Sequence, residues 1–340
     1  MVRSVTIALG HHPTLGRPPG TECVADVTGL GTVPPVPPSP RLRAGAGALA
    51  VVVLAACSDG GDGGSGSTTS TTETEAVRAE LTLGQRVHSA GFVIDAVKVQ
   101  VARNPVGRHT VELVASVENV GPAPVPFEPV ARLEHGGAEL DREPEAADEI
   151  LSIPPATPTA VVIRFPLPDG VAEDGTGLTS GRILFGDPGR HRAVIPLDGA
   201  PPHALAPIPT DAGGRIVAGN VTITVGGGHA RFDDPLSHEN MTAGRALLVL
   251  GFNASRGQGG APNLARDNFR LRLPDGSVTA VRRDGRSAPN VLLAPRTVSE
   301  NLLIRFEVPD PPAGTYVLIL VGPYADDGSE VRGELDFTVG

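Results

Sequence analysis

Alternation of apolar and polar residues is the feature that most restricts the fold of this chain. Val111 and Leu113 flank polar Glu112, and an Asn-Val-Gly-Pro turn sequence ends the run. The same period of two recurs at residues 269–273 and 335–339. A period of two predicts half-buried strands. Because helical spacing is scarce and the 43 Gly and 34 Pro supply many turns, we expect an all-β fold of sandwich type.

The chain also repeats itself. Residues 161–169, Val-Val-Ile-Arg-Phe-Pro-Leu-Pro-Asp, match residues 302–310, Leu-Leu-Ile-Arg-Phe-Glu-Val-Pro-Asp. Shorter matches precede them: residues 84–87 with 214–217, 92–97 with 221–225, and 110–119 with 245–254. A period this long is unlike a solenoid repeat and predicts two tandem domains. We place them at residues 80–199 and 213–340, separated by a Pro-rich linker, residues 200–212, that is expected to form an extended spacer.

A cysteine near the N-terminus follows an apolar run. Arg41 and Arg43 precede the apolar residues 44–56, which close with Leu54-Ala-Ala before Cys57. This pattern resembles the lipobox of bacterial lipoproteins, which implies a signal peptide over residues 1–56 and a lipid attached to Cys57. The alternative is a short apolar helix before a chance cysteine. Since residues 1–40 are unlike a signal peptide, we expect the true translation start to lie downstream, near Val33 or Val36, without Cys23.

The segment after the cysteine is a tether. Residues 57–79 are rich in Gly, Ser and Thr, with too little apolar surface to offset the entropy of ordering, and are expected to be disordered. A lipid on Cys57 would place the rest of the chain outside the cytoplasm, on the outer face of the cell membrane.

The net charge argues against two classes of partner. Four of the 28 basic and two of the 38 acidic residues precede Cys57, so the mature chain would carry 24 against 36 and a formal charge of −12. An acidic chain of this kind argues against nucleic acid binding and against basic patches for anionic lipid. No cysteine follows Cys57, so the domains are expected to fold on core burial alone.

The order of these segments resembles a known family. After the lipobox and tether come Gly84 with Val87, a strand ending in Asn119-Val-Gly, and a late Ile163-Arg-Phe strand. Together they resemble the immunoglobulin-like lipoprotein domains of Gram-positive bacteria named immunoprotective extracellular or telomeric-repeat-binding-factor-like. The resemblance implies tandem immunoglobulin-like sandwiches outside the cytoplasm and no agreed enzymatic activity. Bacterial adhesion-type sandwich modules are an equally similar alternative.

Catalytic motifs are absent from the sequence. It has no nucleophile elbow, HExxH zinc motif, P-loop or dinucleotide-binding glycine pattern. We therefore expect no enzyme and no cofactor.

One segment gathers functional side-chain types. Residues 226–240 follow three glycines and are expected to form a loop that contacts a partner; the candidate residues are His229, Arg231, Phe232, Asp233, Asp234, His238 and Glu239. The alternatives are a plain solvated loop and a transition-metal site formed by imidazole and carboxylate groups. As an exposed loop it is expected to be replaceable without loss of stability.

These features predict a non-catalytic envelope lipoprotein that acts as a binding or scaffold module at the cell surface, with an envelope protein or cell-wall component as partner. The alternatives are a structural spacer or surface antigen, and an enzyme with an unrecognised site. Within the repeated strand, Phe306 is expected in the core and Arg305 on the opposite face, so that Arg305→Ala would cost far less than Phe306→Ala.

Overall fold

The computed structural model describes residues 79–104, 106–144, 150–257, 263–283, 290–294, 296–322, 325 and 328–340. All of them belong to one compact unit. The predicted signal peptide, Cys57 and the tether up to residue 78 lie outside the described residues. The described chain is built of strands, with two short 3-10 turns at Leu178–Ser180 and Arg266–Asn268. The all-β prediction is confirmed.

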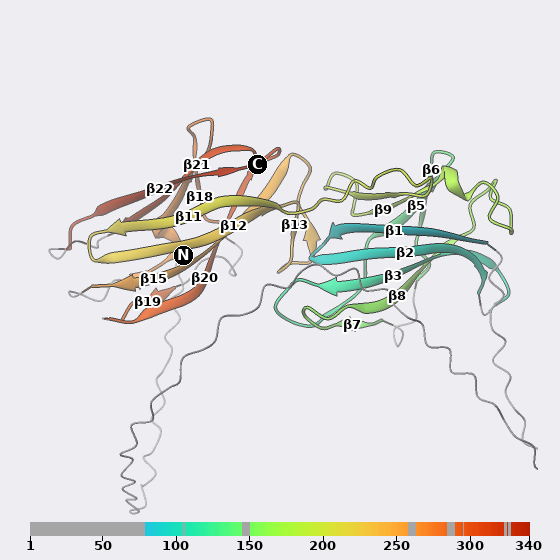
Figure 1. The fold of residues 1–340 in the computed structure, drawn as a ribbon, viewed down its shortest axis with the longest axis horizontal. Helices are drawn as coiled ribbons and strands as arrows, with labels where there is room; N and C mark the ends of the chain where they lie inside the picture. The colour runs from blue at the N-terminus through green and yellow to red at the C-terminus, as the bar shows by residue number, and fades with distance from the viewer. Residues whose placement is uncertain are drawn as a thin grey trace, which may run out of the picture. The chain divides into compact units, whose positions relative to one another are not determined.

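The N-terminal repeat, residues 79–205, is a sandwich of two four-stranded sheets (Figure 1). The first sheet has the order β1 (Ala79–Ser89), β2 (Phe92–Arg103), β3 (His109–Asn119), β8 (Thr159–Pro166). The second has the order β10 (Ala193–Pro196), β9 (Arg182–Phe185), β5 (Ala131–His135), β6 (Ala138–Asp141). A two-stranded ribbon pairs β4 (Val125–Pro126) with β7 (Ser152–Ile153).

Alternation along these strands builds the core. Val111, Leu113 and Phe165 are fully buried between the two sheets, as the period of two predicts. Burial of side chains this size is the main force that holds a domain without disulfides.

The C-terminal repeat, residues 208–340, is organised around one eight-stranded antiparallel sheet. Its order is β18 (Val278–Ala280), β17 (Phe269–Arg272), β21 (Gly314–Gly322), β22 (Val331–Val339), β11 (Ile208–Ala218), β12 (Val221–Arg231), β15 (Arg245–Arg256), β20 (Val298–Pro309). Two short ribbons accompany it: β13 (Asp233–Asp234) with β14 (Glu239–Asn240), and β16 (Asn263–Leu264) with β19 (Val291–Leu292). The backbone N–H of Arg282, after β18, donates to the carbonyl of Arg305 in β20, so the sheet curls until its ends meet.

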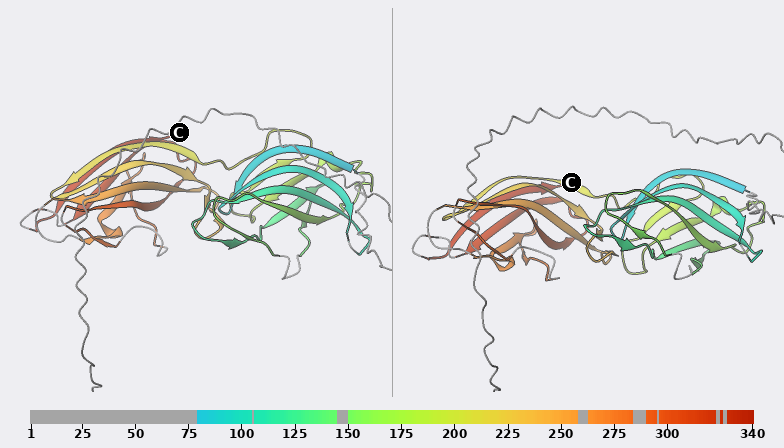
Figure 2. Two further views of the ribbon diagram at one scale, coloured as in Figure 1. Left: turned by 60° about the horizontal axis from the view of Figure 1, so that its bottom comes forward. Right: turned by 90° about the horizontal axis from the view of Figure 1, so that it is seen from below.

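The two repeats share their strand order. Strands β1, β2, β3 and β8 correspond to β11, β12, β15 and β20, and strands β10, β9, β5 and β6 to β22, β21, β17 and β18. The registers agree as well: Leu113 faces Ile163 in one repeat, and Leu250 faces Ile304 in the other. In Figure 2 the long strands of each repeat bow over the facing layer. Residues 161–169 and 302–310 are therefore the same edge strand in two copies of one architecture.

Two of the sequence matches shift in the structure, and the sheet order differs from the expected one. The match of residues 110–119 with 245–254 shifts by two: Leu113 is equivalent to Leu250 and not to Leu248, because Leu113 faces Ile163 and Leu250 faces Ile304. The turn of each hairpin equates Val87 with Ile216 and not with Val217, because Val87 faces Ile94 and Ile216 faces Ile223. The sheet order also differs from the immunoglobulin constant domain, where the second and third strands lie in different sheets. Here β2 and β3 are adjacent in one sheet. The immunoglobulin part of the prediction is not confirmed.

The predicted linker is partly ordered into both repeats. His203 forms an isolated bridge with Val194, and the backbone N–H of His88 donates to Ala204. Leu205 packs into the N-terminal core, and β11 already begins at Ile208. The strand thus starts inside the segment expected to be a spacer.

The repeats differ most in the connection between their second and third strands. Residues 104–108 join β2 to β3, whereas residues 232–244 join β12 to β15. This longer connection contains most of the predicted partner loop and forms the site described next.

Candidate functional site

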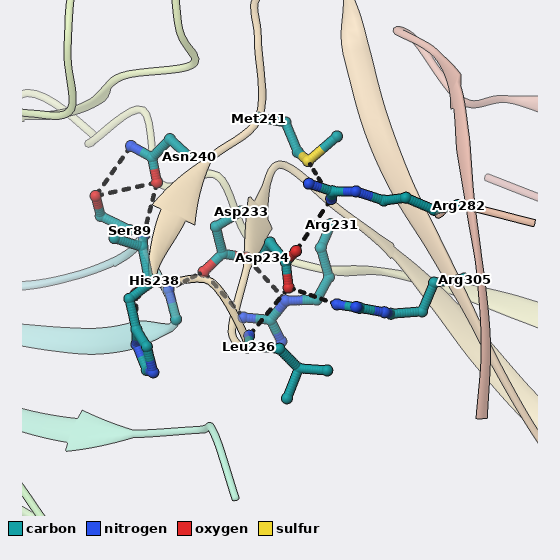
Figure 3. A network of polar contacts seen from close by, with 12 residues as sticks. Ser89, Arg231, Asp233, Asp234, Leu236, His238, Asn240, Met241, Arg282 and Arg305 are labelled. Carbon is teal, nitrogen blue, oxygen red and sulfur yellow. Dashed lines mark hydrogen bonds and ion pairs between the residues drawn. The ribbon is translucent and has the colours of Figure 1, made fainter. Parts of the chain in front are cut away.

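The predicted partner loop is a strand end followed by a buried hairpin. Strand β12 continues through Arg231, with residues 227–231 paired to β15. Arg231, Asp233 and Asp234 are buried, and only Glu239 among the predicted contact residues is exposed. The expectation of a solvated loop is wrong at these positions. We call residues 232–241 the junction segment, because it contacts both repeats (Figure 3).

Asp234 joins the junction segment to its own sheet. One carboxylate oxygen accepts from Arg305 at 2.7 Å and the other from Arg282 at 3.0 Å. The same side chain caps the turn by accepting from the backbone N–H of Leu236. Arg305 lies on the face opposite the main core, as predicted, but its side chain is only 3% exposed. Its face of the sheet is covered by the junction segment.

Apolar contacts cover the same face. Met241 forms a small buried cluster with Leu247 and Val249 of β15. Strand β15 is therefore buried on both sides, because Leu248 and Leu250 point into the main core. A strand covered on both faces carries a continuous apolar run instead of alternation, and the sequence Ala246-Leu-Leu-Val-Leu250 has that form.

Asp233 faces the other way, toward the N-terminal repeat. Its side chain is fully buried and accepts two hydrogen bonds from the Arg231 guanidinium, at 2.8 and 3.1 Å. The backbone N–H of Gly91, in the β1–β2 turn, donates to the same carboxylate at 2.7 Å. Such a pair requires several donors because a buried carboxylate is costly to desolvate.

Asn240 makes the densest set of contacts across the repeats. Its Oδ1 accepts from the backbone N–H of Ala90 at 2.6 Å, and its Nδ2 donates to the hydroxyl of Ser89 and to the carbonyl of His191. Its own carbonyl accepts from Arg190. Asn240 ends the predicted segment, residues 226–240, but was not among the predicted contact residues.

Two glycines of the N-terminal repeat lie against the tip of the junction segment, residues 235–238, and leave space for it. A Cβ on Gly91 would lie 2.7 Å from Pro235 Cα, and one on Gly121 would lie 2.8 Å from the Pro235 carbonyl oxygen. Side chains therefore cannot be added at either place without displacing the tip. His238, at φ 56°, packs beside Phe92 with ring centroids 5.4 Å apart and lies within 3.2 Å of the Ala90 carbonyl through Nδ1.

The remaining predicted residues are also placed inward. Phe232 packs against the cores of both repeats and lies edge-on to the His191 ring. Burial lowers the pKa of His229, and the positive charge of Arg231 lowers it further. Among the residues that the structure describes, no three His, Cys, Asp or Glu side chains are grouped to hold a metal ion.

A cavity of about 400 Å³ opens beside the junction segment. Its walls come from the β1–β2 turn, the stretch 125–130, the loop after β9 and the end of the junction segment; they are Ser89, Ala90, Phe92, Ile94, Val125, Pro126, Phe127, Glu128, Pro129, Val130, Gly186, Asp187, Arg190, His238, Glu239 and Asn240. We call it the junction cavity. Only its His238 and Glu239 belong to the predicted site residues.

Sequence reasoning missed the partners of the predicted residues. Ser89 in β1, Arg282 after β18 and Arg305 in β20 lie far from the predicted segment in the sequence, and no local spacing joins them to it. The apolar run in β15 and the long 232–244 connection were the available signals.

Comparison with known proteins gives no relative: no family model, curated protein or solved structure matches the chain. No helix in the described part of the chain is long and apolar enough to span a membrane.

Proposed function

We propose that this chain is a non-catalytic, lipid-anchored binding or scaffold module on the outer face of a bacterial cell membrane. The observation that carries the binding role is the junction cavity, whose volume of about 400 Å³ falls in the range of small-ligand sites. Such sites occur preferentially where two structural units meet. The anchor rests on the lipobox-like residues before Cys57.

The polar groups near this cavity favour binding over catalysis. The Ser89 hydroxyl is bonded to Asn240, and Arg190 is engaged by Glu239 and by the Asn240 carbonyl. These groups hold the junction together. A nucleophilic hydroxyl needs a base to accept its proton. The group bonded to the Ser89 hydroxyl is the side-chain amide of Asn240, which is not a base.

The N-terminal repeat also contains a serine–histidine pair outside the junction cavity. Ser180 Oγ lies 3.0 Å from His135 Nε2, but the hydroxyl donates to the Gly177 carbonyl at 2.9 Å, and the same imidazole nitrogen lies 3.1 Å from that carbonyl. This geometry closes the 3-10 turn at Leu178–Ser180. The Gly177 carbonyl thus competes with the imidazole for the hydroxyl proton.

The anchor is tested by membrane partitioning. We expect Cys57→Ala to release the protein from the detergent phase or to leave an unprocessed precursor, and Cys23→Ala to have no effect. A Cys57→Ala protein that is still processed and still partitions with detergent would contradict the anchor.

Binding is tested by crosslinking in intact cells. A photoreactive residue at Val130, on the exposed rim of the junction cavity, is expected to give a discrete adduct. The same residue at Val278, which is 56% exposed in the C-terminal repeat, is the matched control. Equal labelling at both positions, or none at Val130, would favour a structural spacer or surface antigen.

A further inference from the structure

The junction cavity has an apolar floor. Phe92, Ile94 and Phe127 line it from the N-terminal core, and the two phenylalanine rings meet edge to face with centroids 5.1 Å apart. Val125 and Val130 extend this apolar surface to the opening. Such a floor favours a ligand whose buried part is apolar, because burying an unpaired charge is costly.

The rim of the same cavity is acidic. Glu128, Asp187 and Glu239 are all exposed there. The same cavity wall contains one arginine, Arg190. Its guanidinium lies 3.1 Å from Glu239 and donates to the Asn240 carbonyl. With Glu239 and Arg190 compensating each other, two carboxylates remain at the opening.

Those two carboxylates differ in their surroundings. The hydrogen bond to Asp141 raises the pKa of Arg132, and the negative charge of Asp187 adds to the shift, so Asp187 lies in the field of that guanidinium. Arg132 itself is bonded to Asp141. For Glu128 the structure gives no ion pair among the described residues. Glu128 is therefore the stronger attractor for a cation at the opening, and Asp187 is the second.

We infer that the junction cavity binds a small amphipathic cation, an apolar body carrying one ammonium or guanidinium group, with the body on Phe92 and Phe127 and the charge between Glu128 and Asp187. This assignment rests on the proposed binding function and names its ligand class. An anion is disfavoured because the rim would repel it. A bare metal ion is disfavoured because Mg²⁺ and Ca²⁺ require several oxygen ligands and the floor offers carbon.

The test uses three probes of similar size: 2-phenylethylammonium, 2-phenylethanol and 3-phenylpropionate. Each is titrated into the full-length protein by isothermal titration calorimetry at low and high salt. We expect the ammonium to bind most tightly and to weaken as salt rises, because partly exposed charges are screened. Glu128→Gln is expected to weaken its binding by about two- to fivefold, the effect of one partly exposed ion pair.

Two further variants make the result specific. Asp169→Asn removes a carboxylate at an exposed turn of the N-terminal repeat outside the cavity and should leave ammonium binding unchanged. Val130→Trp adds bulk at the cavity opening and should abolish binding of the ammonium and the alcohol. Circular dichroism of each variant would show that the fold is retained.

The outcomes separate the two proposals. Equal binding of the ammonium and the alcohol, both lost in Val130→Trp, would overturn the cation assignment while supporting a binding cavity. Tighter binding of the carboxylate would overturn it as well. Absence of binding by all three probes would overturn the ligand class, and the Val130 crosslink would then decide independently whether the cavity rim contacts any partner.

Discussion

Single carboxylates decide how the junction segment is held. Asp233 and Asp234 are adjacent in sequence but point in opposite directions, one toward Gly91 of the N-terminal repeat and the other toward Arg305 of its own sheet. Adjacent residues of a strand point to opposite faces. The short β13 strand therefore places one buried acid on each side of the contact.

Asp234→Ala is predicted to be strongly destabilising. It leaves Arg305, a nearly fully buried cation, without this carboxylate, and breaking such a pair costs about 3–5 kcal/mol. Denaturant unfolding measures the change. Glu307→Ala is the control, since Glu307 is half exposed and pairs with Arg245 at 3.6 Å; its effect is expected to be below about 1 kcal/mol. Comparable effects of the two variants would show that Asp234 contributes nothing special.

The repeated phenylalanine gives a prediction within the cores. Phe306 and Phe165 occupy equivalent positions and are both fully buried. Phe306→Ala and Phe165→Ala are each expected to lower the free energy of unfolding by about 3–5 kcal/mol. A loss below 1 kcal/mol at either site, measured in urea, would contradict the shared core architecture.

Two histidines at the junction predict a pH dependence. Burial lowers the pKa of both His88 and His229; Asp233 opposes the shift at each, whereas Arg231 adds to it. Arg86 lowers and Asp95 raises the pKa of His88 slightly. Since the unfolded imidazoles bind protons near pH 6.5 and the folded ones at lower pH, folding becomes less favourable as pH falls below about 6.5. Melting temperatures between pH 7.5 and 5.5 should fall less in His88→Phe or His229→Phe than in the natural chain.

At the scale of elements, the glycine contacts set how closely the junction segment approaches the N-terminal repeat. Gly121→Ala would place a Cβ 2.8 Å from the Pro235 carbonyl oxygen and is expected to cost about 1–3 kcal/mol through overpacking. Gly226→Ala is the control, because no atom lies within 4 Å of its added Cβ. Equal unfolding free energies for the two variants would argue that the tip adjusts freely.

The strands themselves were largely predictable. Alternation predicted which side chains of β3 point into the core, because neighbouring residues of a strand point to opposite faces. The repeated Ile-Arg-Phe pattern predicted the same edge strand in both repeats. Alternation also places Arg305 opposite the core correctly, but it cannot reveal that a distant insertion covers that opposite face. The prediction of an exposed loop was wrong for the same reason. Its polar residues are typical of a solvated loop, and the sequence does not show that arginines distant in the chain pair with them.

At the scale of the whole chain, the repeat explains why one connection matters more than the other. Residues 104–108 and 232–244 occupy equivalent places in the two repeats, yet only the longer one contains Asp233 and Asn240, which bond to the partner repeat. The longer connection therefore supplies a specific contact between the two repeats that the shorter connection does not. The junction cavity is a product of that contact, since its walls come from both repeats.

Replacing residues 233–240 with a Gly-Ser linker tests this dependence. The replacement removes the buried contacts of Asp233, Asp234 and Asn240, including the bond from Arg305 to Asp234. We expect the natural chain to melt in one calorimetric transition, because the two repeats share these contacts. In the variant we expect the C-terminal repeat to melt first, in a separate transition at lower temperature than that of the N-terminal repeat. Replacing the exposed turn residues 275–277 in the same way should change little, because Asp275 bonds within that turn. A 233–240 replacement that melts like the natural chain would mean that these buried contacts do not couple the repeats, and the sequence-based expectation of a replaceable loop would then hold.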